Sequence, residues 1–435
     1  MWKQKANWVH FIGVAGKTTG QLAIALSEEG YEVTGSDKEI YEPMKSLLSK
    51  KDRIKLFSNF DYKNLIQEDK INPEVKYVPE QVIALGSLPL RNKEILFCRK
   101  RGIPIRSFAQ YFEENLIVKD NSVVVAGSFG KTTTTAILTW VMRDTNISYM
   151  FGGQISGEEI SLRLKQKDAV MSIVEGDEYM SARWDKQSKF FRFHPSRLVL
   201  TGYAHDHLDI FPTEAEYFAN FKKLVEQLPS SAELIINAKY EKLRELSSYA
   251  NCEVVEYSAS EVDWSAYKHN LIGEFNRENL AAAIKTLESI GVEEEKIRRG
   301  IASFPGVSRR LEKVSDNLII DFGSTPGKAS SAIQAVKDEF QGRELVVLLE
   351  PNIGTRSRET IEAFKKALEP ANKVVLLPFA NEEVGELSRE EFARELGLEQ
   401  DLEIQSKKDL SKLEGNYANP MFLVLSSGNV DEFYN

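Results

Sequence analysis

The sequence predicts a mixed α/β protein of three domains, in which parallel sheets carry helices on both faces. Short apolar runs of strand length alternate with amphipathic stretches of helical spacing along the chain, which is the pattern of such sheets. Two of these runs lead through a glycine-rich turn directly into a helix. The length of 435 residues corresponds to about three domains of ordinary size.

The first segment, residues 1–118, is predicted to be a Rossmann-like domain. Its opening strand, Trp8–Val14, leads through a glycine turn and a helix to a second strand that ends in Asp37. Asp37 lies 24 residues after Gly13, and in dinucleotide-binding folds such an acid meets a ribose hydroxyl. A tight turn without a ligand is the alternative. The residues predicted to bind a nucleotide-linked substrate here are Gly13, Gly16, Gly20, Asp37 and Ser87.

The second segment, residues 119–306, is predicted to be a P-loop domain. The strand Val123–Ala126 runs into the glycine loop of GSFGKTTTT, and a helix follows. Such a loop supplies backbone N–H groups, a lysine for the β- and γ-phosphates and a threonine hydroxyl for Mg²⁺. The acid that completes the metal site is Glu175, directly after the predicted strand Ala169–Val174. We therefore expect ATP to bind at Gly127, Gly130, Lys131, Thr132 and Thr133.

The third segment, residues 307–435, is predicted to be a second Rossmann-like domain. Helix-like stretches separate its apolar runs, as in a parallel sheet with helices on both faces. The acidic stretch Glu382–Asp401 is predicted to be a solvent-exposed helical face. The runs predicted as strands are Leu318–Ile320, Leu345–Leu349, Val374–Leu377 and Met421–Leu425.

The composition excludes several classes of protein. Asp and Glu outnumber Lys and Arg by 65 to 56, and a net charge of −9 gives no general attraction for nucleic acid or an anionic membrane. Cys98 and Cys252 cannot form a disulfide framework, and the apolar runs fall short of the about 18 residues of a membrane span. We expect a cytoplasmic protein, monomeric or weakly oligomeric, without nucleic-acid or membrane partners.

Six motifs follow one another along most of the chain: GSFGKTTTT, EGDE, HDHLDIF, GEFNRENLAAA, GVSRRLE and IIDFGSTP. This series resembles the Mur ligase family, whose members use ATP to join an amino acid or peptide to a carboxylate of UDP-linked muramic acid. The opening GVAGKTTGQLA with EVTGSDKEIYEPM resembles the members that recognise UDP-N-acetylmuramate. WDKQSKFFRFHPSRLVL and the EP of LLEPNIGT are most similar to the murein-recycling (Mpl-type) tripeptide ligases. The UDP-N-acetylmuramate–L-alanine ligases are the nearest alternative.

The resemblance implies roles for residues that spacing alone leaves open. Lys131 would act on the transferring phosphate, and Glu175 and His207 would join Thr132 as ligands of Mg²⁺. Asp206 and Asp209 flank His207 and would orient it; a packing histidine is the alternative. The residues implied to contact the rest of ATP are Asn276 and Asn279 at adenine, Arg310 at the γ-phosphate and Asp321 at the ribose. Helix capping by the asparagines and a turn role for Asp321 are the alternatives.

Three further basic residues are candidates for the chemistry. Lys222 stands 16 residues after Asp206, a spacing that resembles the branch of the family in which a lysine carbamate binds a second Mg²⁺; an ordinary surface lysine is the alternative. Arg356 and Arg358 follow the strand Leu345–Leu349, at the end of a parallel strand where ligands bind. Arginine suits a carboxylate, so we expect one of the two to bind that of the incoming amine.

The sequence departs from the family pattern at a few positions. Ser324 and Thr325 replace histidines, Ala204 replaces an acid before the Asp–His pair, and Phe275 replaces a histidine before the first asparagine. These differences leave the identity of the amine open. A ligase for another acidic acceptor, such as polyglutamate, and an inactive nucleotide-gated UDP-sugar-binding protein are the other functions considered. The dinucleotide-type turn with Asp37 argues against the former, and the intact set of P-loop and metal residues argues against the latter.

Overall fold

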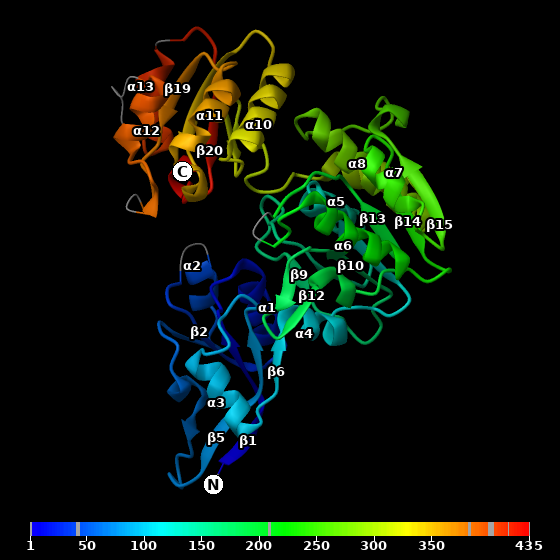
Figure 1. The fold of residues 1–435 in the computed structure, drawn as a ribbon, viewed down its shortest axis with the longest axis vertical. Helices are drawn as coiled ribbons and strands as arrows, with labels where there is room; N and C mark the ends of the chain where they lie inside the picture. The colour runs from blue at the N-terminus through cyan, green and yellow to red at the C-terminus, as the bar shows by residue number, and fades with distance from the viewer. Residues whose placement is uncertain are drawn as a thin grey trace. The chain divides into compact units, whose positions relative to one another are not determined.

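The computed structural model describes residues 2–40, 44–207, 210–381, 384–398, 404–415 and 417–434. The chain divides into two compact units (Figure 1). The first unit consists of Met1–Gln154, Glu158–Lys268 and Glu278–Phe304, and the second of Ile155–Gly157, His269–Arg277 and Pro305–Asn435. None of the helices within the described ranges is long and apolar enough to cross a lipid bilayer.

The first unit begins with a largely parallel sheet of strand order β3-β2-β1-β5-β4. Strand β6 pairs with β5 in parallel, and β4 pairs with β5 in antiparallel orientation. The elements are β1 (Trp2–Ile12), α1 (Lys17–Glu28), β2 (Glu32–Ser36), α2 (Met44–Ser49), β3 (Ile54–Phe57), β4 (Gln67–Glu68), β5 (Lys76–Ala84), α3 (Lys93–Arg101), β6 (Ile105–Ser107) and α4 (Phe108–Asn115).

The centre of this sheet sets the position of the first glycine turn. Residues Trp8–Ile12 of β1 are all buried, as expected for a central strand covered on both faces. Gly13 follows with a φ of +87°, and a Cβ atom there would lie 2.7 Å from the Cβ of Leu85. The turn from β1 into α1 therefore requires glycine at this position.

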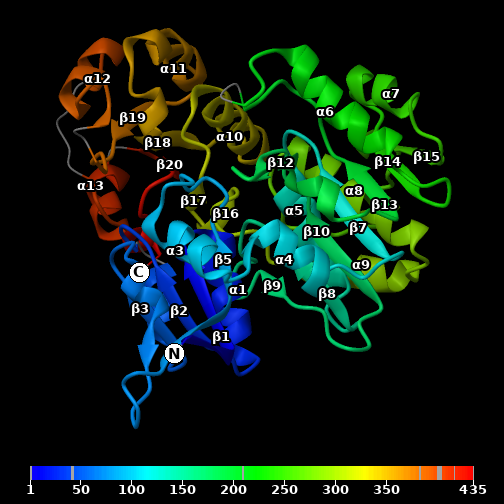
Figure 2. The ribbon, with the colours of Figure 1, turned by 60° about the horizontal axis from the view of Figure 1, so that its bottom comes forward.

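The next sheet of the first unit has the strand order β15-β14-β13-β7-β10-β8-β9, and only β9 within this described order is antiparallel to its neighbour. Figure 2 shows β13, β14 and β15 side by side beneath α6 and α7. The elements are β7 (Ser122–Ala126), α5 (Lys131–Val141), β8 (Ile147–Met150), β9 (Leu162–Arg163), β10 (Met171–Glu175), β11 (Met180–Ala182), β12 (Asp185–Ser188), β13 (Arg197–Leu200), α6 (Glu214–Glu226), β14 (Glu233–Asn237), α7 (Glu241–Ser247), β15 (Glu253–Tyr257), α8 (Glu274–Ser289) and α9 (Glu294–Ser303).

The second unit contains a sheet of strand order β16-β17-β20-β18-β19. Val347 and Leu349 of β18 pack into one apolar cluster, while Val346 and Leu348 pack into another on the opposite face. This alternation shows a sheet covered on both sides. The elements are β16 (Glu312–Ser315), β17 (Leu318–Asp321), α10 (Pro326–Glu339), β18 (Glu344–Glu350), α11 (Ile361–Leu368), β19 (Lys373–Leu376), α12 (Arg389–Leu396), α13 (Ser411–Glu414) and β20 (Pro420–Ser426).

The predicted fold class is confirmed: the protein is α/β with parallel sheets covered by helices. The predicted helix Glu214–Gln227 and strand Arg197–Leu200 agree with α6 and β13 to within one residue. The antiparallel pair β11–β12 was not predicted, because its sequence has no apolar alternation. The domain boundaries 1–118, 119–306 and 307–435 stay a prediction, and the acidic stretch Glu382–Asp401 lies partly outside the described residues.

A buried polar cluster stabilises the first sheet. The side chain of Glu94, at the start of α3, is fully buried. Its carboxylate accepts hydrogen bonds from Ser36 Oγ at 2.6 Å, Asn64 Nδ2 at 2.8 Å and the Asp61 backbone N–H at 3.2 Å. His10 Nε2 lies 3.7 Å from the same carboxylate. The cluster thus connects β1, β2 and α3.

We predict that Glu94→Ala lowers the free energy of unfolding by about 3 kcal/mol or more, because each buried donor left unsatisfied costs about 1–3 kcal/mol. The control is Lys93→Ala, which truncates the exposed neighbouring side chain. Urea denaturation followed by fluorescence measures both variants. Equal stability of the two would contradict a stabilising role for this cluster.

Candidate active site

The strand order of the sheet that contains β7 brings three of its loops together. β7 lies between β13 and β10, all three strands are parallel, and their carboxyl ends therefore meet at one edge. The P-loop follows β7, the acidic segment Glu175–Glu178 begins at the end of β10, and the loop that contains His207 follows β13. This is the edge at which ligands bind in open α/β sheets.

The P-loop depends on two glycines. Gly127 has a φ of +126°, and a Cβ atom there would lie 2.8 Å from the carbonyl oxygen of Gly202. Gly130 has a φ of +85°, and its Cβ would collide with Oδ1 of Asn279. The loop leads directly into α5, whose first turn presents unpaired backbone N–H groups. The geometry is that of a phosphate-binding loop at a helix N-terminus.

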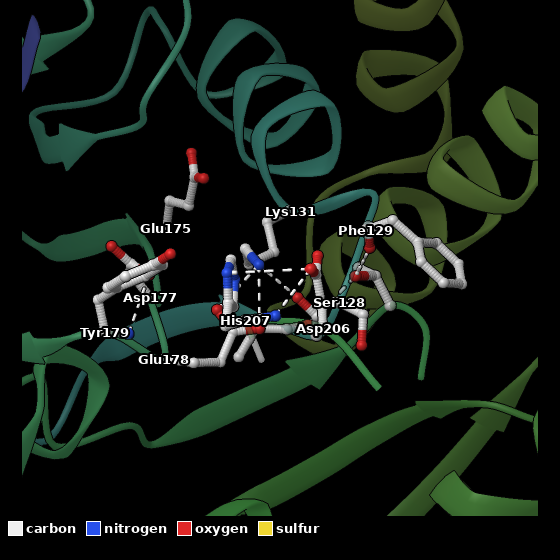
Figure 3. Close-up of polar contacts among 12 residues, drawn as sticks. Ser128, Phe129, Lys131, Glu175, Asp177, Glu178, Tyr179, Asp206 and His207 are labelled. Carbon is white, nitrogen blue, oxygen red and sulfur yellow. Dashed lines mark hydrogen bonds and ion pairs between the residues drawn. The ribbon is translucent and has the colours of Figure 1, made fainter. Parts of the chain in front are cut away.

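Lys131 forms a buried ion pair with Glu178, a partner that the sequence motifs do not predict. Its Nζ donates to the Gly127 carbonyl at 2.5 Å and lies 3.0 Å from both carboxylate oxygens of Glu178. Figure 3 shows the lysine side chain reaching from the start of α5 toward Glu178. Burial alone would lower the pKa of Lys131, but the carboxylates of Glu178 and Glu175 outweigh it and raise this pKa above its ordinary value. Lys131 is therefore charged at neutral pH.

Glu178 is in turn fixed by Tyr217 of α6. The Tyr217 hydroxyl donates to Glu178 Oε1 at 3.1 Å and lies 2.9 Å from Oγ of Ser128 in the P-loop. Ser128 Oγ also donates to the Ala204 carbonyl at 2.7 Å and accepts from its N–H at 2.8 Å. Tyr217 and Ser128 were not predicted as site residues, because their partners come from distant parts of the chain.

Thr132 and Glu175 lie together as predicted for a metal site. The Thr132 hydroxyl donates to Glu175 Oε1 at 3.0 Å, and the backbone N–H of Gly152 donates to Glu175 Oε2 at 2.7 Å. Hydroxyl and carboxylate oxygens suit the hard Mg²⁺ ion, which usually keeps water and phosphate oxygens in its shell. No group of three or more His, Cys, Asp and Glu side chains in the described ranges could hold a metal ion by itself. The pair thus fits a Mg²⁺ that arrives with a nucleotide.

His207 has a strained backbone and an aromatic neighbour. Its φ is +57°, which is uncommon for a residue other than glycine. The backbone N–H donates to Asp206 Oδ1 at 2.8 Å, and the imidazole ring packs edge-on against Tyr179 with centroids 4.4 Å apart. The predicted metal role of His207 stays a prediction. Asp209, its other predicted neighbour, lies outside the described residues.

A cavity of about 210 Å³ lies between the first glycine turn and the acidic segment after β10. On one side it is lined by Gly16–Thr19, at the start of α1. On the other side it is lined by Glu175, Asp177 and Lys189. Apolar residues complete the wall, namely Leu85, Phe108, Met150 and Phe193. The cavity therefore extends from the predicted substrate turn to Glu175 of the predicted metal pair.

The other residues predicted for the first turn have structural partners. Asp37 accepts a hydrogen bond from the backbone N–H of Ala15 at 2.9 Å, so its carboxylate braces the turn. A Cβ atom on Gly20 would collide with Met44 of α2. Ser87 is exposed, and its carbonyl accepts a hydrogen bond from Nε of Arg183 at 2.9 Å. A ribose contact by Asp37 stays a prediction.

The two asparagines of α8 belong to different environments. Asn279 is buried with its Oδ1 against the position of Gly130, so it lies at the P-loop. Asn276 is also buried, and its Nδ2 donates to the Ile272 carbonyl within the second unit. The structure therefore brings Asn279 to the predicted nucleotide site, whereas the amide of Asn276 donates to a backbone carbonyl, the reverse of a capping contact, in which a side-chain oxygen accepts from a backbone N–H.

In the second unit, Asp321 ends β17, and Arg310 lies two residues before β16. The Asp321 carboxylate accepts hydrogen bonds from the backbone N–H groups of Leu311 at 2.8 Å and Gly323 at 2.6 Å. Burial raises the pKa of Asp321, although these bonds and Arg310 oppose the shift. Arg310 is exposed, with its guanidinium 5.9 Å from the ring centroid of Phe322. Their nucleotide roles stay predictions.

Of the two arginines predicted to offer one anchor for the amine, Arg356 is held inside its own unit. Its side chain is 1% exposed and donates to the carbonyls of Pro351 and Ala380 at 3.0 and 2.7 Å. It also pairs with Glu350 at 3.2 Å, so the guanidinium is held inside the unit. Arg358 is 64% exposed, with Glu386 and Glu395 at 3.5 and 3.6 Å. Of the two arginines, only Arg358 is accessible to a substrate.

The carbamate hypothesis for Lys222 gains no support from its position. Its Nζ lies 3.8 Å from the ring centroid of Tyr249 and 3.8 Å from Glu226 Oε1. Tyr217 is the residue of α6 that contacts the P-loop, and side chains five positions apart on a helix point about 140° apart. Lys222 therefore points away from the P-loop side, as an ordinary surface lysine would.

The fold and the site together define a class of protein. One unit contains a P-loop, a hydroxyl–carboxylate pair whose oxygens suit Mg²⁺, and another glycine turn, and a cavity extends from that turn to Glu175 of the pair. This is a nucleotide-dependent α/β enzyme of the P-loop class.

The chain belongs to the Mur ligase family. The family's catalytic-domain model matches residues 8–116, and the model described as the Mur ligase middle domain matches residues 125–287. It is therefore an ATP-dependent acid–amino-acid ligase, as its motifs predicted.

Named relatives agree with this assignment. The chain is 27% identical to the UDP-N-acetylmuramate–L-alanyl-γ-D-glutamyl-meso-2,6-diaminoheptandioate ligase of Haemophilus influenzae, over 80% of each chain. It is 25% identical to the UDP-N-acetylmuramate–L-alanine ligase of Lactobacillus delbrueckii, over 95% of this chain and 94% of the relative. The crystal structure of the UDP-N-acetylmuramate–alanine ligase from Thermotoga maritima is 22% identical, covers 97% of this chain and 96% of its own, and has a TM-score of 0.71, which shows the same fold.

We predict that Arg356→Met lowers the free energy of unfolding by about 3–5 kcal/mol, because it leaves the Glu350 carboxylate buried without its ion pair. Arg358→Met makes the same chemical change at an exposed position, where ion pairs are worth about 0–1 kcal/mol. Guanidinium denaturation of both variants measures the difference. If Arg356→Met is as stable as Arg358→Met, Arg356 is not a structural residue and its predicted substrate role regains support.

Proposed function

We propose that this ligase joins an amino acid or peptide to the carboxylate of UDP-N-acetylmuramate, in the synthesis or recycling of peptidoglycan precursors in the cytoplasm. The observation that carries the proposal is the cavity between the first glycine turn and the Thr132–Glu175 pair. A UDP-sugar held at that turn would extend toward the P-loop, where ATP is activated. The family of this chain supports the same assignment, and the names of both relatives give UDP-N-acetylmuramate as the acceptor.

The proposed chemistry has two steps. An oxygen of the acceptor carboxylate attacks the γ-phosphorus of ATP, the bond to the β,γ-bridging oxygen breaks, and ADP leaves. The amine nitrogen then attacks the acyl carbon of the acyl phosphate, phosphate leaves with the bonding electrons, and the nitrogen loses a proton. Both steps depend mainly on charge stabilisation and orientation.

The residues of the first unit have separate tasks in this scheme. Lys131, held by Glu178, stabilises negative charge on the transferring phosphate. Thr132 and Glu175 would hold Mg²⁺, which neutralises phosphate charge when it is bound. Asn279, beside Gly130, is proposed to contact adenine. Asp321 and Arg310 of the second unit are proposed to contact the ribose and the γ-phosphate.

Two amines are candidates for the second substrate. We propose the tripeptide L-Ala-γ-D-Glu-meso-diaminopimelate, because the EP motif at the end of β18 resembles the murein-recycling branch. Glu350 of that motif anchors the buried Arg356, which leaves Arg358 as the proposed partner of the amine's carboxylate. L-Alanine is the second candidate, since relatives with that substrate match 95% of this chain.

A turnover screen tests the function directly. ADP and phosphate release are measured with ATP, Mg²⁺ and UDP-N-acetylmuramate, while the amine is varied among the tripeptide, L-Ala, Gly and L-Ser. Turnover that requires both the acceptor and one amine supports the proposal. Turnover with a polyglutamate acceptor, but not with UDP-N-acetylmuramate, would show that the acceptor is polyglutamate. Binding of ATP and UDP-sugar without turnover by any amine would favour an inactive binding protein.

We predict that Lys131→Ala lowers the ligation rate by about 10²–10³-fold, because it removes a preorganised charge from the transferring phosphate. Calorimetry should find the affinity for UDP-N-acetylmuramate unchanged, since that ligand is proposed to bind at the first turn. Lys119→Ala, at an exposed lysine, is the control. Wild-type turnover in Lys131→Ala would show that this loop does not bind the transferring phosphate.

We predict that Asp37→Ala weakens UDP-N-acetylmuramate about tenfold and leaves the affinity for ATP unchanged. The carboxylate holds the Ala15 N–H, so its loss loosens the turn that is proposed to bind the nucleotide. Lys38→Ala, next to it and exposed, is the control. A loss of ATP affinity with intact UDP-sugar binding would reverse the assignment of the two glycine loops.

A further inference from the structure

Lys189 is a basic residue in the cavity that the scheme above does not use. It is the first residue after β12, and its side chain is 16% exposed. The cavity wall contains Lys189 together with Glu175 and Asp177 on the side opposite the first glycine turn. A cation is thus present where two carboxylates would otherwise repel an anionic acceptor.

The position of the Lys189 ammonium is fixed from several sides. Asp177 Oδ2 accepts a hydrogen bond from Nζ at 2.6 Å, and Asp177 itself is held by the backbone N–H of Tyr179 at 3.1 Å. The ring centroids of Phe108 and Tyr179 lie 4.9 and 5.8 Å from Nζ. A lysine ammonium has three N–H donors, so the bond to Asp177 leaves it capacity for a further acceptor.

The two lysines near the cavity face different acids. Lys131 pairs with Glu178 and the Gly127 carbonyl, both at the P-loop. Lys189 pairs with Asp177, which lies two residues after Glu175 and faces the cavity. A phosphate at the P-loop therefore meets Lys131, whereas an anion that enters from the first glycine turn meets Lys189.

We propose that Lys189 binds the acceptor's carboxylate and holds it in the cavity for transfer, with Asp177 as the residue that positions the lysine. This inference rests on the proposed function, because it requires an acceptor that spans from the first turn to the metal pair. The carboxylate must approach a phosphate through a region that contains Glu175 and Asp177. Lys189 supplies the positive charge that makes this approach favourable.

The alternative is a purely structural ion pair, which would hold β12 against the segment after β10 without touching the substrate. The two roles differ in their dependence on the acceptor's chemistry. UDP-N-acetylglucosamine has the same nucleotide and sugar ring but lacks the lactyl carboxylate. A structural loss would affect both UDP-sugars, whereas a lost carboxylate contact would affect UDP-N-acetylmuramate alone.

The experiment compares Lys189→Met with Lys186→Met in the full-length chain. Lys186 lies three residues earlier in β12 and is exposed, so it controls for removing one positive charge from this hairpin. Isothermal calorimetry measures the affinities for UDP-N-acetylmuramate, UDP-N-acetylglucosamine and ATP. Steady-state kinetics with the amine found in the screen measures kcat and the KM of the acceptor.

We expect Lys189→Met to weaken UDP-N-acetylmuramate about 10- to 100-fold, the effect of losing a hydrogen bond between charged groups. The affinities for UDP-N-acetylglucosamine and ATP should match those of Lys186→Met. Lys189→Arg should retain most of the wild-type affinity, because it keeps the charge. Lys189→Gln serves as a second neutral variant if Lys189→Met does not fold, with the same expected pattern.

Two results would overturn the proposal. One is an unchanged affinity of Lys189→Met or Lys189→Gln for UDP-N-acetylmuramate, and the other is an equal loss for both UDP-sugars. Failure of the proposed function gives a different result, because the wild-type chain would then bind UDP-N-acetylmuramate no better than UDP-N-acetylglucosamine.

Discussion

The ion pair between Lys131 and Glu178 is the interaction on which the rest of the site depends. It connects the P-loop after β7 to the acidic segment after β10 inside a region from which water is largely excluded. A buried charge is costly unless it is paired and hydrogen-bonded, and Tyr217 and the Gly127 carbonyl complete the pairing. The pair therefore fixes the relative positions of the P-loop lysine and of Glu175, three residues before Glu178.

A second lysine pairs with the same acidic segment. Lys131 is held toward the P-loop, while Lys189 is held by Asp177 toward the cavity that leads to the first glycine turn. The two lysines thus pair with two acids of the segment Glu175–Glu178, which lowers the net negative charge that a phosphate or a carboxylate meets there. Electrostatic preorganisation of this kind is the main source of catalysis in phosphoryl transfer.

In the second unit, a buried carboxylate likewise connects the ends of several strands. Glu350, at the end of β18, accepts hydrogen bonds from Arg356, from Ser426 and from the backbone N–H of Ala380. Arg356 and Ala380 lie in the loops after β18 and β19, and Ser426 is the last residue of β20. A single buried carboxylate thus orders the carboxyl edge of the sheet, and the accessible Arg358 lies just beyond it.

The sequence by itself determined the fold class, both glycine loops and the pairing of Thr132 with Glu175, because local periodicity and short motifs encode strands, turns and the residues at strand ends. It did not distinguish Arg356 from Arg358, nor identify Glu178 as the partner of Lys131. Those distinctions depend on which side chains become buried and on contacts between residues far apart in the chain. Only the tertiary structure decides burial, because the desolvation of a charge depends on elements that pack around it from elsewhere in the sequence.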